Sequence, residues 1–279
     1  MQRVSLSRFR PEAVQDLIRL GRDSDGGYLV SRRAVASTRV LISAGVADDW
    51  SFEEDFARIQ PLARIMALDG SVGLWQFSRS AIRHLWSALR EAAQRGPRSA
   101  SSDLARAVHF AQTAFNFAHF FSHPARTFEK KFLGDGVSPD WVGLDDILRQ
   151  WSPTPHDGAG PQVFLKVDIE GGEYAIAPTI AAHHQMISAV VIEWHDLGTR
   201  WAEFEGLMDR LLPAFAVAHL HGNNHAPLIP ATNIPTVLEM TLLSRELMEQ
   251  GHRPTELMYP LPLDRPCNSR REDYRLSFD

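Results

Sequence analysis

Cysteine is nearly absent from the sequence, and so are lysine and long apolar runs. Cys267 is the only cysteine, which excludes an intrachain disulfide or a cluster of thiolate ligands. All but three of the 29 basic residues are arginine, a skew typical of a GC-rich, bacterial genome. No run approaches the roughly 18 apolar residues of a membrane-spanning helix, and residues 1–17 lack the apolar core of a signal peptide. We therefore expect a cytoplasmic protein without a membrane span.

An excess of positive charge is also missing. The net charge of −5 and the pI of about 6.2 argue against a dedicated nucleic-acid binder, which normally carries a basic surface. A composition with 44% hydrophobic and 23% charged residues is that of a globular protein. The length of 279 residues fits one α/β domain with an insertion or two small domains. We predict a single domain over residues 1–279.

Short apolar runs alternate with helical patterns along the chain. Six runs have the length and composition of strands, at 39–43, 64–68, 163–167, 188–193, 215–221 and 237–244. Helical patterns lie between them, at 52–59, 143–151 and 204–213. This alternation predicts an α/β fold with a mostly parallel sheet and helices on both faces. The last two runs are joined by a polar loop without a helix, which predicts that the final strand is antiparallel.

Residues 72–125 interrupt the alternation and form a predicted helical insertion. Two helical patterns lie between residues 74 and 121, and the first carries Trp75, Ile82 and Trp86 on one face. The second is apolar nearly all round, so it must be buried against something. A lid over an acceptor site is our first interpretation, and a contact within a homodimer is the second. Membrane association is less favoured, because the arginines cluster on the first helix.

The ends of the first two predicted strands have features of a nucleoside site. Ligands of open α/β sheets bind beyond the carboxyl ends of the strands. Gly45 and Ala47 follow the first strand, and Asp69 follows the second at the spacing where an acidic residue binds a ribose. Asp48 and Asp49 would repel a pyrophosphate, so a phosphate-free nucleoside such as S-adenosylmethionine fits better. A plain tight turn is the alternative for this loop.

Polar residues also follow three further predicted strands. Residues 163–176 read VFLKVDIEGGEYAI, with three carboxylates around a glycine pair, and the next two strands end in EWH and HLHGNN. The clustering at one rim predicts a functional site, although a structural role is the alternative for each histidine taken singly. The segment DSDGGY, residues 23–28, is either a hairpin turn or a loop that folds over a cofactor.

These motifs resemble a known enzyme family. LKVDIEGGEYAI, VVIEWH and HLHGNN, followed by VLEMTLLS, resemble the FkbM family of S-adenosylmethionine-dependent methyltransferases. GRDSDGGYLVS, LISAGVADDWSFEEDF and FEKKFLGDG are similar to segments of one branch of that family. The resemblance covers residues 20–60 and 126–245, and leaves out the insertion at 72–125 and the proline-rich tail at 251–279. Ala47 stands where the family more usually has glycine.

The resemblance implies a fold and an activity. The fold would be a seven-stranded, Rossmann-like class I methyltransferase sheet with an antiparallel last strand. The donor would be S-adenosylmethionine, and the acceptor a hydroxyl group of a sugar, a glycan or another small metabolite. The implied cofactor-binding residues are Asp25, Gly26, Ser43, Gly45, Ala47, Asp48, Phe52, Glu53, Asp69, Gly70, Ser71, Asp168 and Glu170.

Methyl transfer to a hydroxyl needs alignment of donor and acceptor and removal of a proton. Asp168, His195 and His221 are the predicted catalytic residues, because they can orient the hydroxyl or accept its proton. A divalent cation held by Asp168 with Glu193, His195 or Asn224 is the alternative that we weigh second.

Two other function classes remain open at this point. One is a catalytically inactive nucleoside-binding protein of the same fold, since fold alone does not establish activity. The other is a metal-dependent hydrolase that uses the Asp, Glu and His side chains to activate water.

Overall fold

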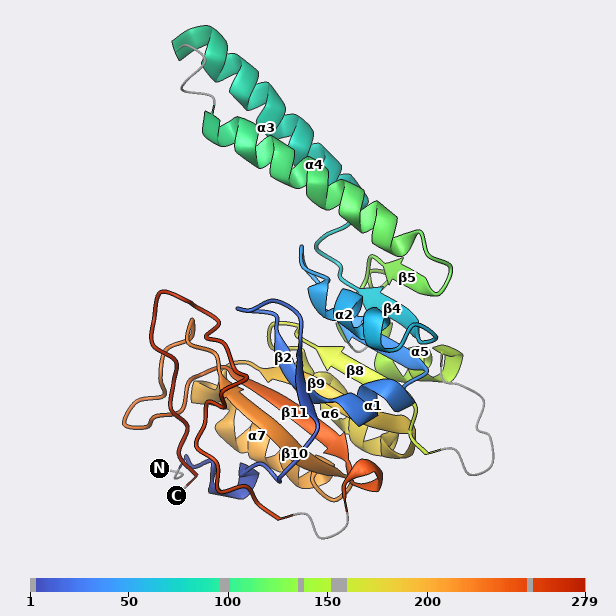
Figure 1. Cartoon of the computed structure of the whole chain (residues 1–279), viewed down its shortest axis with the longest axis vertical. Helices are drawn as coiled ribbons and strands as arrows, with labels where there is room; N and C mark the ends of the chain where they lie inside the picture. Colours follow the sequence, from blue (N-terminus) through green and yellow to red (C-terminus); the bar gives the residue numbers. More distant parts are fainter. Residues whose placement is uncertain (1–3, 96–100, 135–137, 152–159, 250–252, 279) are drawn as a thin grey trace.

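A seven-stranded mixed sheet forms the centre of the protein (Figure 1). In the computed structural model, the residues described are 4–95, 101–134, 138–151, 160–249 and 253–278. The strands follow one another across the sheet in the order β5-β4-β3-β8-β9-β11-β10. Their bounds are β3 Val40–Ala44, β4 Arg64–Leu68, β5 Arg126–Glu129, β8 Val163–Val167, β9 Ile187–Trp194, β10 Phe215–Gly222 and β11 Leu238–Ser244.

Strand direction confirms the predicted fold class. Parallel pairing joins β5, β4, β3, β8 and β9, whereas β11 pairs antiparallel with both β9 and β10. The chain therefore inserts its last strand, reversed, between the fifth and sixth strands of the sheet. This order is that of the class I methyltransferase sheet. Five of the seven strands are buried along their whole length on both faces, which explains their continuous apolar runs.

Helices cover both faces of the sheet. Helices α5 Leu144–Trp151, α6 Glu173–Ala182 and α7 Leu197–Leu211 pack with one apolar cluster, and α1 Arg32–Ser37 and α2 Ser51–Ile59 with the other. Successive residues of β3 alternate between the two clusters, as the two faces of a strand require. Short 3-10 turns lie at Ser7–Phe9, His184–Met186 and Arg245–Leu247.

Two small strand pairs lie outside the main sheet. Strands β1 Leu17–Leu20 and β2 Tyr28–Ser31 form an antiparallel hairpin, so the hairpin interpretation of DSDGGY is confirmed. Strands β6 Phe132–Gly134 and β7 Trp141–Gly143 pair in parallel. Of the seven main strands, only β5 is absent from the six runs that the sequence singled out.

Helices α3 Leu74–Arg95 and α4 Ser101–Phe121 lie within the predicted insertion and form a long hairpin that projects away from the sheet (Figure 1). At its base the Phe117 ring packs against the rings of Trp50, Phe77 and Phe128, with centroid distances of 5.5, 5.6 and 4.8 Å. Trp75 near the base and Trp86 further out are 70% and 68% exposed. Within the described residues, neither these helices nor any other combines the length and apolar character needed to cross a membrane.

The proline-rich tail packs on the sheet rather than extending from it. Tyr259, Leu261, Leu276 and Phe278 are buried in the same apolar cluster as α5, α6 and α7. The Tyr259 ring contacts His219 of β10, with the centroids 5.5 Å apart. The described part of the tail, residues 253–278, is therefore part of the core at the β10 edge of the sheet.

Candidate active site

The ends of β3 and β8 meet at the switch point of the sheet. The chain runs outward from β3 through β4 and β5, and in the opposite direction from β8 through β9, so ligands of such sheets bind between these two strand ends. Gly45 has a φ of +79°, and a Cβ placed there would lie 1.6 Å from the carbonyl oxygen of Asp168. The glycine is required because the two backbones touch.

Asp69 holds together the loops that follow β3 and β4. Its Oδ2 accepts a hydrogen bond from the Ala47 amide at 2.9 Å, and its Oδ1 accepts from the Ser71 amide and hydroxyl at 2.7 and 2.6 Å. Ala47 has a positive φ of 46°, which explains why glycine would be more usual at this position. The Val72 amide also donates to Oδ1, at 3.3 Å, whereas Oδ2 accepts only one hydrogen bond from the described residues and so keeps capacity for a ribose hydroxyl.

Glu53 is a buried carboxylate beside this loop. The Ser43 hydroxyl donates a hydrogen bond to its Oε1, while its Oε2 is buried without a partner among the described residues. Burial raises the pKa of Glu53, and the nearby Lys166 ammonium opposes that rise. An unpaired buried acceptor is costly unless a ligand satisfies it, so this oxygen fits the ammonium group of a methionyl moiety.

Two further predicted cofactor residues, Phe52 and Gly70, are packed against aromatic rings. Phe52 is a core residue, with its ring against those of Tyr28, Phe56 and Phe164. Gly70 lies beneath the Phe132 ring, since a Cβ there would come within 2.3 Å of it.

Asp48 and Gly26 are two further predicted cofactor residues, in or beside the loop after β3. Asp48 lines a cleft of about 250 Å³ between the loop after β3 and residues 109–116 of α4. A Cβ at Gly26 would lie 3.1 Å from the Asp49 carboxylate.

A second, acidic cavity of about 320 Å³ opens at the tips of β8 and β9. Asp25, Asp168, Glu193, His195 and Asn223 line it, and they come from the β1–β2 turn and from the ends of three strands. The Asn223 amide donates to Glu193 at 2.7 Å and to Asp25 at 3.5 Å. Glu170 also lines the cavity, so the structure brings together five of the predicted site residues, and adds Asn223.

Burial and charge set the protonation of this cavity. Burial raises the pKa of Asp168, while Lys166 and His195 oppose the rise. Burial and the Asp168 charge hold the pKa of Glu193 well above its usual range. Burial would lower the pKa of His195, but the carboxylates of Glu173 and Asp168 outweigh it and raise the value to about 9. His195 is therefore a cation at neutral pH and donates a proton rather than accepting one.

Glu173 positions His195 and closes the DIEGGE turn. Its Oε1 accepts from the Ile169 and Gly171 amides at 3.2 Å each, and lies 2.9 Å from His195 Nδ1. These contacts give Glu173 a structural role in the turn. The neighbouring Glu170 has an 87% exposed side chain, and its nearest oxygen is 3.5 Å from His195 Nε2.

His221 and Asn224 do not line the acidic cavity. Asn224 is buried and ties the tail to the sheet, because its Oδ1 accepts from the Asn268 amide at 2.6 Å and its Nδ2 donates to the Asn268 carbonyl at 3.1 Å. His221 is buried between Glu239 and Asp273. Their proposed catalytic and metal-binding roles therefore have no geometric support at this cavity.

Two residues beside Asp168 escaped the sequence analysis. The Tyr28 hydroxyl donates to Asp168 Oδ2 at 3.4 Å, and Lys166 Nζ donates to the Gly45 carbonyl at 3.4 Å. Lys166 could have been found, because it is a lone charge inside the apolar strand β8 and one of only three lysines. Tyr28 could not, since only the tertiary structure brings β2 beside the end of β8.

Asp168, Glu193 and His195 could also hold a cation. One potential ligand atom from each lies within 4.8 Å of the other two. Carboxylate and imidazole ligands of this kind suit manganese or another transition metal.

This chain is similar to known proteins in its fold. No family model matches the chain, and no curated protein matches its sequence. A precorrin-6y C5,15-methyltransferase from Geobacter metallireducens GS-15 is 13% identical, with a TM-score of 0.38, over 77% of this chain and 88% of its own.

Two further methyltransferase structures are similar. The O-methyltransferase TomG from Streptomyces achromogenes, in complex with SAM, is 13% identical, with a TM-score of 0.36, over 76% of this chain and 75% of its own. A 16S rRNA (adenine(1408)-N(1))-methyltransferase from Catenulisporales acidiphilia is 12% identical, with a TM-score of 0.29, over 82% of this chain and 98% of its own. At these identities and TM-scores, the similarity concerns the fold alone and not what this chain binds.

Proposed function

We propose that the protein is an S-adenosylmethionine-dependent O-methyltransferase related to the FkbM family. The observation that supports this most directly is the meeting of Gly45 and Asp168 at the switch point, in a sheet with the class I strand order. A donor bound over the β3 and β4 loops would lie beside the acidic cavity. The proposed acceptor is a hydroxyl group of a sugar, a glycan or another small metabolite.

Asp168 is the proposed general base. S-adenosylmethionine supplies an electrophilic methyl group on a sulfonium, so the protein itself needs no nucleophile. Asp168 lies in the cavity between the Tyr28 hydroxyl and the His195 imidazolium, which can hold its carboxylate in place. Its raised pKa makes it a stronger base than an ordinary aspartate. His195, as a cation, would orient the acceptor rather than deprotonate it.

The residues around the β3 and β4 loops are proposed to bind the donor. Asp69 would accept hydrogen bonds from the ribose hydroxyls, and the unpartnered oxygen of Glu53 would accept from the methionyl ammonium. Ser43 acts through Glu53, since its hydroxyl holds the other carboxylate oxygen.

A metal-dependent hydrolase is the second candidate function. The observation that favours it is the convergence of Asp168, Glu193 and His195, which could hold a divalent cation that activates water. The same cation could assist methyl transfer by lowering the pKa of the acceptor hydroxyl. A nucleoside-binding protein without activity would use the same fold but would not depend on Asp168.

Titration with S-adenosylhomocysteine, followed by turnover with a methyl-labelled donor and a panel of sugars and metabolites, tests the proposal. Asp168→Asn should lower turnover by roughly 100-fold or more and leave donor affinity unchanged. Asp209→Asn, the same change at an exposed side chain of α7 that does not line the cavity, is the control and should leave turnover near normal. Absence of donor binding, together with chelator-sensitive hydrolysis, would instead support the hydrolase.

A further inference from the structure

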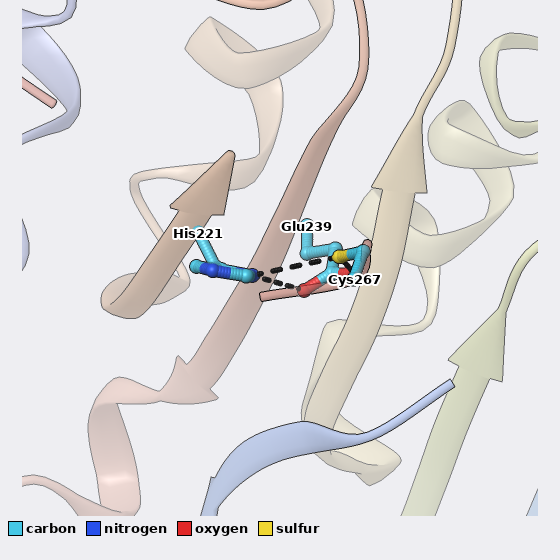
Figure 2. A group of neighbouring side chains, drawn as sticks. All are labelled: His221, Glu239 and Cys267. Atoms are coloured by element: carbon cyan, nitrogen blue, oxygen red, sulfur yellow. Dashed lines mark hydrogen bonds and ion pairs between the residues drawn. The ribbon is translucent and has the colours of Figure 1, made fainter. Parts of the chain in front are cut away.

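A separate cluster of three metal-ligand side chains lies where the tail crosses the sheet (Figure 2). His221 Nδ1 lies 2.8 Å from Glu239 Oε2, Cys267 Sγ lies 3.1 Å from Glu239 Oε1, and Cys267 Sγ lies 3.9 Å from His221 Nδ1. Glu239 thus turns one oxygen toward each of the other two residues. All three side chains are buried.

The sheet and the tail together fix these positions. His221 of β10 and Glu239 of β11 are directly opposed in the antiparallel register, so their side chains share one face of the sheet. Cys267 comes from the tail, which folds over the same strands. Two ligands are therefore preset by strand pairing, and the third arrives only when the tail has docked.

Asp273 lies behind the histidine. Its Oδ2 is 2.9 Å from His221 Nε2, on the side of the ring away from Cys267. A carboxylate that accepts the Nε2 proton holds the imidazole in the tautomer whose Nδ1 has a free lone pair. Metal-binding histidines commonly have such a partner on the nitrogen that does not bind the metal.

We propose that His221, Glu239 and Cys267 bind a zinc ion, which fastens the tail to β10 and β11. Zinc takes one thiolate, one imidazole and one carboxylate readily, in tetrahedral geometry. Ligand atoms around a tetrahedral zinc are separated by about 3.3–3.6 Å, given metal–ligand distances of about 2.0–2.3 Å. The three observed separations lie on both sides of that range. A water molecule would fill the fourth position, as in other zinc sites with three protein ligands.

Zinc binding here would release two protons to solvent. Without the metal, the ring nitrogens of His221 each face a carboxylate and each carry a proton. The metal replaces the Nδ1 proton and the proton of the Cys267 thiol, while the Nε2 proton stays in the hydrogen bond to Asp273. Without the metal, burial raises the pKa of the Cys267 thiol, so the thiol remains protonated and donates to Glu239. The metal would also screen the Glu239 charge from Glu193, its register partner on β9, and so couple this site to the acidic cavity.

A neighbouring histidine–carboxylate pair resembles the His221–Glu239 pair but lacks a third ligand. His219 and Asp264 also join β10 to the tail, with Nε2 and Oδ2 3.1 Å apart and both side chains buried. No third ligand group of the described residues completes that pair. It is therefore a matched control for a buried histidine–carboxylate contact.

The test uses the full chain, purified after expression in zinc-supplemented medium. Elemental analysis should find about one zinc per chain in the wild type and in Asp264→Asn, and none in Cys267→Ala. Replacement of zinc by cobalt(II) should give a thiolate-to-cobalt absorption band, which can come only from Cys267 because it is the sole cysteine.

A milder variant covers the case in which Cys267→Ala does not fold. Asp273→Asn keeps all three ligands, and should keep the cobalt–thiolate band while weakening zinc binding by roughly 10–100-fold in a chelator competition. Wild-type protein that retains no zinc and gives no such band would overturn the proposal. Zinc retained by folded Cys267→Ala would also overturn it and place the metal at the Asp168 cavity instead.

Discussion

Replacement of Gly45 by alanine should damage both the fold and the proposed donor site. The added Cβ would lie 1.6 Å from the Asp168 carbonyl oxygen and 2.7 Å from its carbonyl carbon. Both atoms belong to the backbone at the end of β8, so no side-chain rotation relieves the overlap. The ends of β3 and β8 must separate, or Gly45 must leave its positive φ.

Two costs set the expected loss of stability. An alanine in the left-handed region costs roughly 1–2 kcal/mol relative to its preferred conformations. Forcing extra volume into a packed site costs typically about 1–3 kcal/mol more. Gly45→Ala should therefore lower the free energy of unfolding by about 2–5 kcal/mol, and should weaken S-adenosylhomocysteine binding because the loop after β3 moves.

Urea denaturation gives the free energy of unfolding, and calorimetric titration of the folded variant gives the affinity. Gly206→Ala is the matched control, because Gly206 lies in α7 with nothing within 4 Å of an added Cβ. That variant should gain up to about 1 kcal/mol from helix propensity. A loss smaller than about 1 kcal/mol for Gly45→Ala would refute the close approach of β3 and β8.

Three further predictions concern Asp69, His195 and the helical hairpin. Asp69→Ala should weaken S-adenosylhomocysteine binding measured by calorimetry, whereas Asp209→Ala, which removes an exposed carboxylate of α7, should not; unchanged affinity in Asp69→Ala would remove Asp69 from the site. The folded-state pKa of His195 is raised from 6.5 to about 9. The charged form of His195 therefore stabilises the folded protein fully below about pH 6.5, and this stabilisation is lost as pH rises through 9. Wild-type stability should fall over that range relative to His195→Gln, and parallel curves would contradict the ion pair with Glu173. Deletion of residues 74–121, bridged by a Gly/Ser linker, should abolish turnover but preserve donor binding if the hairpin is a lid, and the number of chains per particle in solution should not change. A fall from two chains to one would identify a dimer contact.

Local patterns in the sequence determined most of the fold. The six apolar runs appear as β3, β4, β8, β9, β10 and β11, because strands buried on both faces need continuous apolar residues. The helix-free loop before the last run predicted its reversal, since a parallel connection needs a crossover. Strand β5 escaped because its four residues, Arg126–Glu129, are only half-buried and mix charged with apolar side chains.

The candidate site was only partly visible in the sequence. Residues directly after parallel strands were placed at one rim, because the carboxyl ends of such strands share an edge; Asp168 and His195 meet there for that reason. The sequence could not choose between Asn223 and Asn224, since adjacent residues of an extended chain point in opposite directions. Burial and neighbouring charge, which fixed His195 as a cation, also depend on contacts distant in sequence.

The tail shows what tertiary structure alone decided. Its prolines predicted an irregular segment, but nothing local indicated that Cys267 and Asp273 would lie against His221, 46 and 52 residues earlier in the chain. Likewise, the apolar character of the insertion predicted burial, yet α3 and α4 bury mainly their shared face and the base of the hairpin. Periodicity specifies which face of an element is apolar; which partner covers that face is set by the packing of the whole chain.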